Sequence, residues 1–423
     1  MPKLDLADNF NAARHEDWQK LVEKGLKGAD FESLAKYSED SFARGPLSTE
    51  SDRPQNIAQM PRAGAPLLDG RPWHICAPVR DSELSFANTQ MLNDLNGGAS
   101  AVRIRLGEGG IAVKHASDIK RLLEQVYTDL IPITLAPNNN IGNAALFKAY
   151  ETAALYLGLG PKTEGLAALA ADIPDSWRLI TINAARVHDT GGTNAQELAY
   201  FAASAAYAFR VLGKAGAKHI GAELTTDQDG HMSIAKLRAA RRIYARIAES
   251  FGADDAPLSL HVISSKRMMQ AVDPWSNMLR VMSAGFGAVI GGADFITLRP
   301  FTDALGTATP FGYRAARNMQ LMMMEESHLG HVQDAAFGSY FHERMTDSLA
   351  KAAWTEFQHI EADGGIDNIY PFKTRIKAAA TARADKAEPI LGVTLHPLDK
   401  DSSAFKTAKV RGAKSEGQNH EPS

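Results

Sequence analysis

The amino-acid sequence predicts an α/β protein built around a (β/α)8 TIM barrel. From Trp73 onwards, short apolar runs typical of buried strands alternate with helical patterns of about ten to twenty residues. Strands that alternate with helices imply right-handed βαβ units and therefore a parallel sheet. About seven or eight such repeats in roughly 250 residues fit a closed barrel better than an open doubly wound sheet, which stays the alternative.

An N-terminal extension is expected over residues 1–64, where it would serve as a dimerisation arm. A helical pattern runs through residues 18–34, and residues 45–66 are rich in Pro, Ser and Gly and should be irregular. A short helix on a polar tether buries too little area to be stable alone. The extension should therefore lie on another surface.

The barrel and the helices that follow it are expected to span residues 65–395. In the predicted helix 234–250, apolar residues recur on one face, and Lys and Arg are expected to cover the rest. The predicted strands are 73–78, 101–106, 131–135, 179–183, 219–224, 258–263 and 295–298. The predicted helices between them are 82–95, 116–126, 143–157, 195–212, 234–250 and 274–290.

After Pro300 the pattern becomes mostly helical, with predicted helices over residues 311–326, 346–362 and 373–387. Met319, Met322 and Met323 lie close together in the first of them. Methionines fill irregular gaps, which favours a place in the core over a place in an interface. Residues 396–423 are polar and without periodicity, so a disordered tail is predicted there.

Composition narrows the functional classes. Of the 423 residues, 44% are hydrophobic, and the net charge of −3 does not indicate a nucleic-acid-binding surface. The single cysteine, Cys76, excludes an internal disulfide framework and a cysteine-rich zinc site, and it fits a reducing compartment. Neither a secretory signal nor an apolar run long enough to cross a membrane is found. A cytoplasmic protein without membrane or nucleic-acid partners is expected.

Residues 258–303 are the first candidate for a site, because they are predicted to form strand, loop, helix and strand. His261 is expected towards the carboxyl end of the first strand, where barrels usually place their chemistry. A buried core histidine is an equally good interpretation. No other histidine or carboxylate stands within about three or four residues of His261, so no metal site is predicted.

Three other motifs give weaker signals. Residues 107–112 fit G-x-G-x-x-A, but no strand ending in an acidic residue follows about 20 positions later, which favours a barrel loop. Asp229-Gly230-His231 resembles the start of D-x-H-x-x-G, a cobalamin-binding motif, but Ile234 replaces the glycine and favours a helix N-cap.

His188 follows a predicted strand and is the one candidate for a cofactor contact, because a neutral imidazole can donate to a carbonyl or phosphate. A bond from His188 to nearby backbone is the alternative.

Many segments also follow a known pattern in their order and spacing. They are residues 27–31, 71–73, 234–241, 258–261, 273–280, 315–321, 325–327, 338–340, 346–350, 360–366 and 389–393. Together they resemble the acyl-CoA mutase barrel of the methylmalonyl-CoA mutase family, over about residues 15–395. The resemblance implies a barrel that holds an acyl-CoA thioester through its centre. It also implies a separate domain with adenosylcobalamin, whose cobalt–carbon bond starts a radical rearrangement.

The residues that should do this chemistry are altered. His261 matches the family's active-site histidine. Pro78 stands approximately where catalytic members have a tyrosine, and proline has no hydroxyl. Glu223 stands approximately where they have an arginine that binds the substrate carboxylate, and a glutamate should repel that carboxylate. The sequence also ends where the cobalamin domain would begin.

The resemblance is therefore to the small, or β, subunit type, which lacks the cobalamin-binding domain. It implies a chain without catalytic residues that pairs with a catalytic large subunit, while the large subunit binds adenosylcobalamin and interconverts methylmalonyl-CoA and succinyl-CoA. Two alternatives stay open: the substrate-binding barrel of a split acyl-CoA mutase, and a stand-alone acyl-CoA-binding protein. An open channel along the barrel axis would favour the alternatives, and a centre filled with bulky side chains would favour the non-catalytic subunit.

Overall fold

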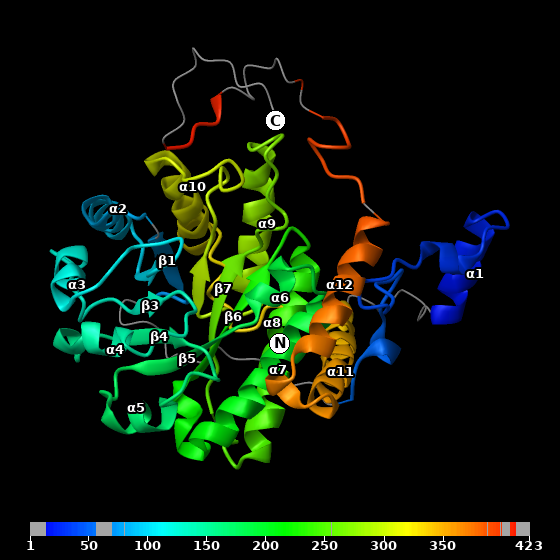
Figure 1. Ribbon diagram of the computed structural model, residues 1–423. Helices are drawn as coiled ribbons and strands as arrows, with labels where there is room; N and C mark the ends of the chain where they lie inside the picture. The colour runs from blue at the N-terminus through cyan, green and yellow to red at the C-terminus, as the bar shows by residue number, and fades with distance from the viewer. Residues whose placement is uncertain are drawn as a thin grey trace, which may run out of the picture.

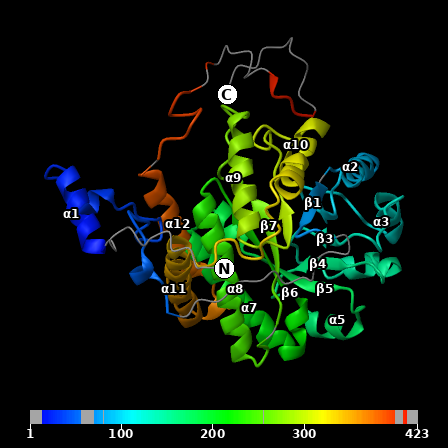
Figure 2. The same ribbon diagram turned by 180° about the vertical axis from the view of Figure 1, so that it is seen from behind.

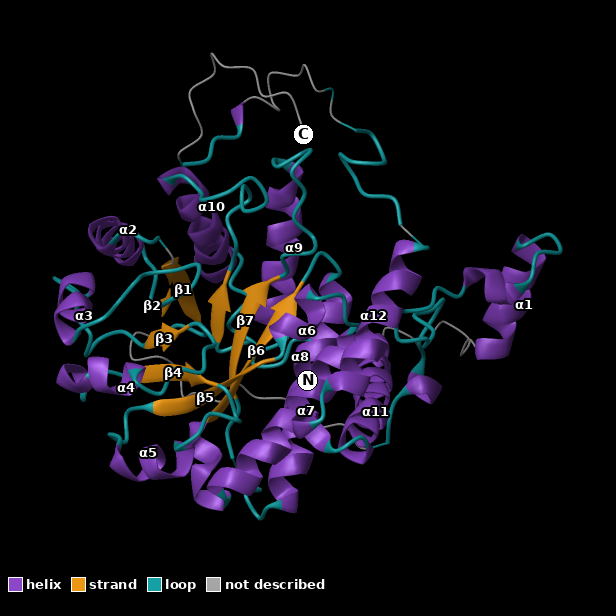
Figure 3. Cartoon of the chain, viewed as in Figure 1, coloured by secondary structure: helices purple, strands orange, loops and turns teal. Residues whose placement is uncertain are grey.

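The computed structural model describes residues 14–55, 70–79, 81–254, 256–386, 388–397, 399 and 407–411. Eight parallel strands form a closed barrel in which each strand pairs with its neighbours along the chain and β8 pairs with β1 (Figures 1 and 3). The predicted (β/α)8 barrel is therefore confirmed. The strands are β1 (His74–Val79), β2 (Ala101–Ile104), β3 (Ile133–Leu135), β4 (Leu155–Leu159), β5 (Arg178–Asn183), β6 (Ile220–Thr226), β7 (Ser259–Ser264) and β8 (Phe295–Thr297).

The fourth strand is the one that the sequence pattern did not predict. A single helix was expected over residues 143–157, because apolar residues and alanines continue through it. The structure instead has the short helix α4 (Asn143–Leu146), a 3-10 turn (Lys148–Tyr150) and then β4. Leu155, Leu157 and Leu159 are buried on the strand. The prediction was wrong because no glycine or proline marks the end of the helix before the strand begins.

Helices surround the barrel and cover its outer face (Figure 3). Those between strands are α2 (Leu84–Asn96), α3 (Ala116–Leu122), α4, α5 (Leu166–Asp172), α6 (Ala185–Asp189), α7 (Asn194–Leu212), α8 (Gly230–Ser250) and α9 (Ser276–Ile290). After β8 come α10 (Pro310–Leu321), a π-helical turn (Met322–Glu326), α11 (Tyr340–Ala362) and α12 (Tyr370–Ala384). Short 3-10 helices cover Phe31–Leu34, Glu50–Asp52, Lys214–His219 and Gly365–Asp367. The main core lies between the strands and these helices.

Helix α8 departs from the expected amphipathic pattern. Lys236, Arg238 and Arg241 are buried rather than solvent-exposed. The helix is enclosed because α11 packs across both α7 and α8. Arg238 forms ion pairs with Asp334 at 3.2 Å and with Glu343 at 2.7 Å, so the charge that the fold buries here is compensated.

The packing of α11 on α7 and α8 limits which surfaces of the helices after β8 are open to a partner chain. Helix α11 lies against the barrel helices of its own chain, so its inner face is not available to a partner. Of the three methionines singled out in the sequence, Met323 is buried and Met319 packs against the core, whereas Met322 is 40% exposed. The core interpretation holds for Met323 and Met319.

The N-terminal arm extends away from the barrel. Helix α1 (His15–Gly25) projects beyond α12 and no residue on it is buried, as both views in Figures 1 and 2 show. The chain turns back after α1, where Lys27 and Gly28 have positive φ, so the predicted continuous helix 18–34 ends early. Trp18 packs edge-on against Phe31 at 5.8 Å and links α1 to the 3-10 turn.

Part of the predicted C-terminal tail lies against the barrel. Val410 bridges to Ala308, and the Arg411 N–H donates to the Thr307 carbonyl at 2.7 Å. The Arg411 side chain pairs with Asp81 and lies over the Phe86 ring at 3.5 Å. Residues 407–411 thereby connect the loop after β1 with the loop after β8, and the rest of residues 398–423, apart from 399, lies outside the described residues.

Candidate functional site

The centre of the barrel is filled by a stack of rings. Phe295 of β8 lies between two histidines, with ring centroids 4.3 Å from His261 of β7 and 4.6 Å from His74 of β1. Tyr156 of β4 packs edge-on against both His261 and Phe295, at 5.1 Å in each case. Side chains of β1, β4, β7 and β8 therefore meet on the barrel axis.

His261 lies inside this stack and not at the carboxyl end of its strand. It is the third residue of β7, opposite Phe295 in the register of β8, and only 5% of it is exposed. The expected position was wrong because β7 begins at Ser259 and continues to Ser264, one residue beyond the apolar run. Burial lowers the pKa of His261 to about 3, so the imidazole is neutral, and its Nε2 lies 3.2 Å from the Ser259 hydroxyl.

Above the rings, an ion pair crosses the barrel from β2 to β6. Arg103 donates from Nε to Glu223 Oε2 at 2.6 Å and from Nη2 to Oε1 at 2.8 Å. This bidentate pair neutralises the Glu223 carboxylate, which the sequence predicts only to repel a substrate carboxylate. Arg103 was missed, although its place as a charged residue in the apolar run 101–106 was a signal that it faces inwards.

The mouth of the barrel holds a polar cavity of about 780 Å³ at the carboxyl ends of the strands. Pro78, Arg103, Glu223 and Thr297 line it, whereas His261 and the other stacked rings do not. Both acidic and basic side chains line it, and Arg299 pairs with Asp303 at 3.1 Å. The cavity therefore ends at the ion pair instead of continuing down the axis.

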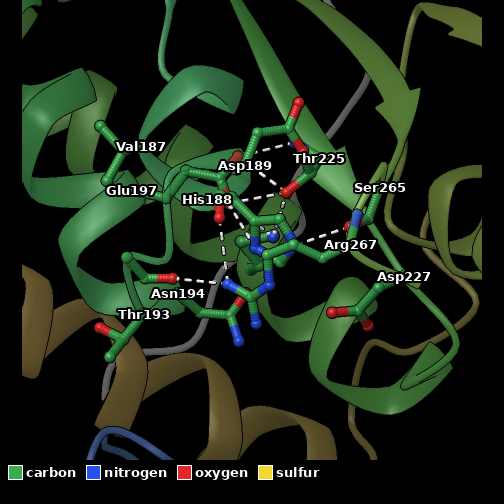
Figure 4. Close-up of polar contacts among 12 residues, drawn as sticks. Val187, His188, Asp189, Thr193, Asn194, Glu197, Thr225, Asp227, Ser265 and Arg267 are labelled. Carbon is green, nitrogen blue, oxygen red and sulfur yellow. Dashed lines mark hydrogen bonds and ion pairs between the residues drawn. The ribbon is translucent and has the colours of Figure 1, made fainter. Parts of the chain in front are cut away.

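His188 belongs to a buried polar cluster beside the mouth (Figure 4). Its Nε2 lies 2.8 Å from the Ser265 hydroxyl, and its Nδ1 lies 3.7 Å from Glu197 Oε2. Burial, reinforced by the charges of Lys236 and Arg267, lowers the pKa of His188 well below its usual value. The histidine is neutral and 1% exposed, so it supports neighbouring loops and is not presented to the mouth cavity.

Glu197 and Lys236 form the charged centre of this cluster. Lys236 Nζ donates to Glu197 Oε2 at 2.7 Å and to the Thr225 hydroxyl at 3.0 Å. The Thr225 N–H also donates to Glu197 Oε1 at 2.7 Å, which ties α7 and α8 to β6. The sequence pattern missed both residues. Glu197 stands in the mostly apolar α7, and Lys236 stands among the Lys and Arg of α8 that were expected to face solvent.

The N-terminal arm closes over the same region. Glu39 pairs with Arg383 of α12 at 2.6 Å and approaches Arg267 at 3.9 Å. Asp40 accepts the Ala195 N–H at the start of α7 at 3.1 Å. Burial raises the pKa of Asp40 to about 6, because the carboxylate loses water when the arm covers it.

The segment Asp229-Gly230-His231, which resembles the start of a cobalamin-binding motif, forms the beginning of α8. Asp229 caps α8 by accepting the Met232 N–H at 3.1 Å and pairs with Arg44, while His231 Nδ1 lies 3.0 Å from His342 Nε2. The motif is thus the first turn of a helix and not a cobalt-binding loop. Across the described ranges there is no group of three or more His, Cys, Asp or Glu able to hold a metal ion, and no helix is long and apolar enough to cross a membrane.

Comparison with known proteins gives one family. A sequence model of the methylmalonyl-CoA mutase family matches residues 162–419. The chain is 34% identical to the methylmalonyl-CoA mutase small subunit of Streptomyces virginiae, over 93% of this chain and 72% of that protein. It is 31% identical to the small subunit of Propionibacterium freudenreichii subsp. shermanii, over 93% and 70% of the two chains. It is 36% identical to a probable small subunit of Mycobacterium tuberculosis, over 85% of this chain and 65% of the relative, so it spans about two thirds of the length of these proteins.

Proposed function

The chain belongs to the methylmalonyl-CoA mutase family, and we propose that it is the structural subunit of a heterodimeric, adenosylcobalamin-dependent methylmalonyl-CoA mutase. In this proposal a larger catalytic chain binds adenosylcobalamin and interconverts methylmalonyl-CoA and succinyl-CoA. The present chain supplies no catalytic residue and stabilises the complex. Relatives that carry the name small subunit support this assignment.

The filled barrel axis is the observation that carries the proposal. A thioester held through the centre of a barrel needs a continuous channel, and close-packed side chains do not leave one. Here the stack around Phe295 occupies the axis, and the Arg103–Glu223 pair closes the floor of the mouth above it. Opening the channel would mean displacing the stacked rings, of which His261 and Phe295 are buried, together with a buried ion pair.

The residues at the three positions that align with the family's catalytic residues also support a non-catalytic role. Pro78 brings no hydroxyl to the mouth, and the Glu223 carboxylate is already occupied by Arg103. His261 lies below that pair and stacks on Phe295, out of reach of the mouth cavity. A substrate bound in the cavity would meet none of the three groups in the form that the reaction needs.

The N-terminal arm is the part of the chain best suited to hold a partner subunit. Helix α1 has a strongly amphipathic sequence but buries none of its apolar side chains, and Leu21 is 71% exposed. An exposed apolar face on a projecting helix marks an association surface. We infer that α1 packs against the catalytic subunit, with residues 36–44 fixing the arm to this chain.

Purification with and without a catalytic large subunit tests the proposal. The chain alone, supplied with adenosylcobalamin and methylmalonyl-CoA, should form no succinyl-CoA, whereas the complex should turn over. In the complex, His261→Gln should leave kcat and KM unchanged within about twofold, because a ring that touches no substrate gives no transition-state stabilisation.

Two results would contradict the non-catalytic role. One is turnover of any acyl-CoA by this chain when only an isolated cobalamin-binding domain is added, which would favour the split mutase. The other is a loss of kcat by more than about tenfold in His261→Gln while the complex still elutes intact from a sizing column. Lys120→Gln, on the exposed face of α3, provides the matched control.

A further inference from the structure

A second cavity of about 660 Å³ lies under α12, apart from the barrel axis. Helix α12 stands at the side of the barrel next to α11 (Figures 1 and 2), and its residues form one wall. The opposite wall comes from the loops after β3 and β4 and from α6. Pro137, Asn183 and Arg186 line both this cavity and the mouth cavity, so the two meet at that edge.

The wall under α12 is apolar and aromatic. Tyr200 and Phe372 stack with their rings 6.3 Å apart and nearly parallel. Ile366, Ile369 and Ile376 continue the wall, with Val187 of α6 beside them. A flat hydrocarbon or aromatic group fits such a surface, because it can lie against rings and branched side chains at once.

The charge of the lining is one-sided. Lys162, Arg186, Lys373 and Lys377 line the cavity, and none of the described lining residues is an aspartate or glutamate. Asp367 neutralises Lys162 at 2.7 Å, so Arg186, Lys373 and Lys377 supply the positive charge. Thr181 lies at the inner wall, 3% exposed, and within the described part of the chain its hydroxyl has no hydrogen-bond partner. An anionic group entering beside the lysines would meet complementary charge and a free hydroxyl.

The cavity is also held in shape before any ligand arrives. Arg383, near the end of α12, donates to the Gly191 carbonyl at 2.9 Å and pairs with Glu39 of the arm. Ala380 packs so closely on Gly191 that a side chain there would clash at 2.6 Å. At the other end of α12, Phe372 and Ile376 are buried in a cluster with α7 and α11. A preformed cavity costs little ordering entropy when it is filled.

We propose that the cavity under α12 binds a small amphipathic anion, with a flat apolar body against Tyr200 and Phe372 and a carboxylate or phosphate group near Arg186, Lys373 and Lys377. The volume lies within the roughly 300–1,000 Å³ of small-molecule sites. The site is separate from the barrel axis and does not depend on the subunit role, because binding at α12 needs neither the partner nor turnover.

Calorimetric titration of the full chain tests this site. Naphthalene-2-carboxylate and 1-naphthyl phosphate should bind, and the tighter of the two identifies the preferred head group. 2-Naphthylmethanol lacks the charge and acetate lacks the ring, so both should bind at least about tenfold more weakly. The double substitution Lys373→Glu/Lys377→Glu should weaken naphthoate binding by about tenfold or more, because both charges face the ligand.

A matched variant separates local from general charge effects. Lys120→Glu/Lys148→Glu changes the net charge equally, on exposed positions of the chain that do not line the cavity, and should leave the Kd within about twofold. Equal binding of naphthoate by the two double variants would overturn the proposal, as would equal affinity for 2-naphthylmethanol. Circular dichroism of each variant shows that the comparison is made between folded chains.

Discussion

Replacing Glu223 by leucine should destabilise the chain severely, because it leaves the Arg103 guanidinium without its charge partner inside the barrel. The two side chains are 7% and 10% exposed, and they share two hydrogen bonds of 2.6 and 2.8 Å. Breaking one side of such a pair costs more than the pair contributes, since the remaining charge stays largely buried.

The magnitude follows from the geometry. With charge centres about 4 Å apart and an effective dielectric constant of about 20, the lost attraction is about 4 kcal/mol. Single removal of a buried partner typically costs about 3–5 kcal/mol, which agrees with that figure. Because the pair borders the mouth cavity, water can reach the guanidinium, and we expect the lower end, about 3 kcal/mol.

Urea unfolding measures this loss, with the buried residues Trp73 and Trp177 as fluorescence probes and circular dichroism as a second signal. Arg103→Met/Glu223→Leu serves as the control, since it removes both charges and should recover most of the stability. A loss below about 1 kcal/mol in Glu223→Leu alone would refute the reasoning, because it would mean that solvent already screens the pair.

Two further predictions concern the N-terminal arm. Asp40→Asn keeps an acceptor for the Ala195 N–H but removes the buried charge. The pKa of Asp40 rises from 3.8 to about 6 on folding. The contribution of Asp40 to folding stability is therefore full below about pH 4 and is lost as the pH rises through 6. Asn should therefore match wild type at pH 4 and be more stable by roughly 1–3 kcal/mol at pH 8, as urea unfolding at the two pH values would show; equal differences at both pH values would contradict this. Leu21→Asp should abolish association with the catalytic subunit, as measured by chromatography with light scattering. It should shift the Tm of the free chain by only about 1–2 °C, because Leu21 is 71% exposed. A complex that persists would exclude α1 as the docking element.

Local periodicity was enough to predict most of the barrel. Seven of the strands appear as short apolar runs that glycine, proline or polar residues separate from amphipathic helices. β4 escaped because its leucines follow an alanine-rich segment without a break, so helical and strand spacing could not be separated there. The burial of Lys236 and Arg238 also escaped, since α11, which covers α8, lies about a hundred residues further along the chain.

The candidate site was predicted less well than the fold. Pro78, Glu223 and His261 could be picked out by resemblance, but their partners come from distant strands. Arg103 meets Glu223 across 120 positions of sequence, and His188 meets Ser265 across 77. Such pairs depend on the closure of the barrel, and no local pattern encodes them. The cavity under α12 is likewise formed only when the last helix packs on the loops after β3 and β4.

The ring stack has a mechanical consequence for the barrel. The seam between the first and last strands has only two register pairs, His74 with Phe295 and Ile75 with Ile296, whereas β6 and β7 share six. The β3–β4 and β4–β5 pairings are equally short. His74 and Phe295 stack across the β1–β8 seam, and His261 of β7 stacks on Phe295, so the rings add side-chain contact where backbone pairing is short. Replacing one of these rings with a small side chain, so that a ligand could enter the axis, would also remove contacts that hold β1 against β8. A substitution that opens a channel here therefore weakens the closure of the barrel.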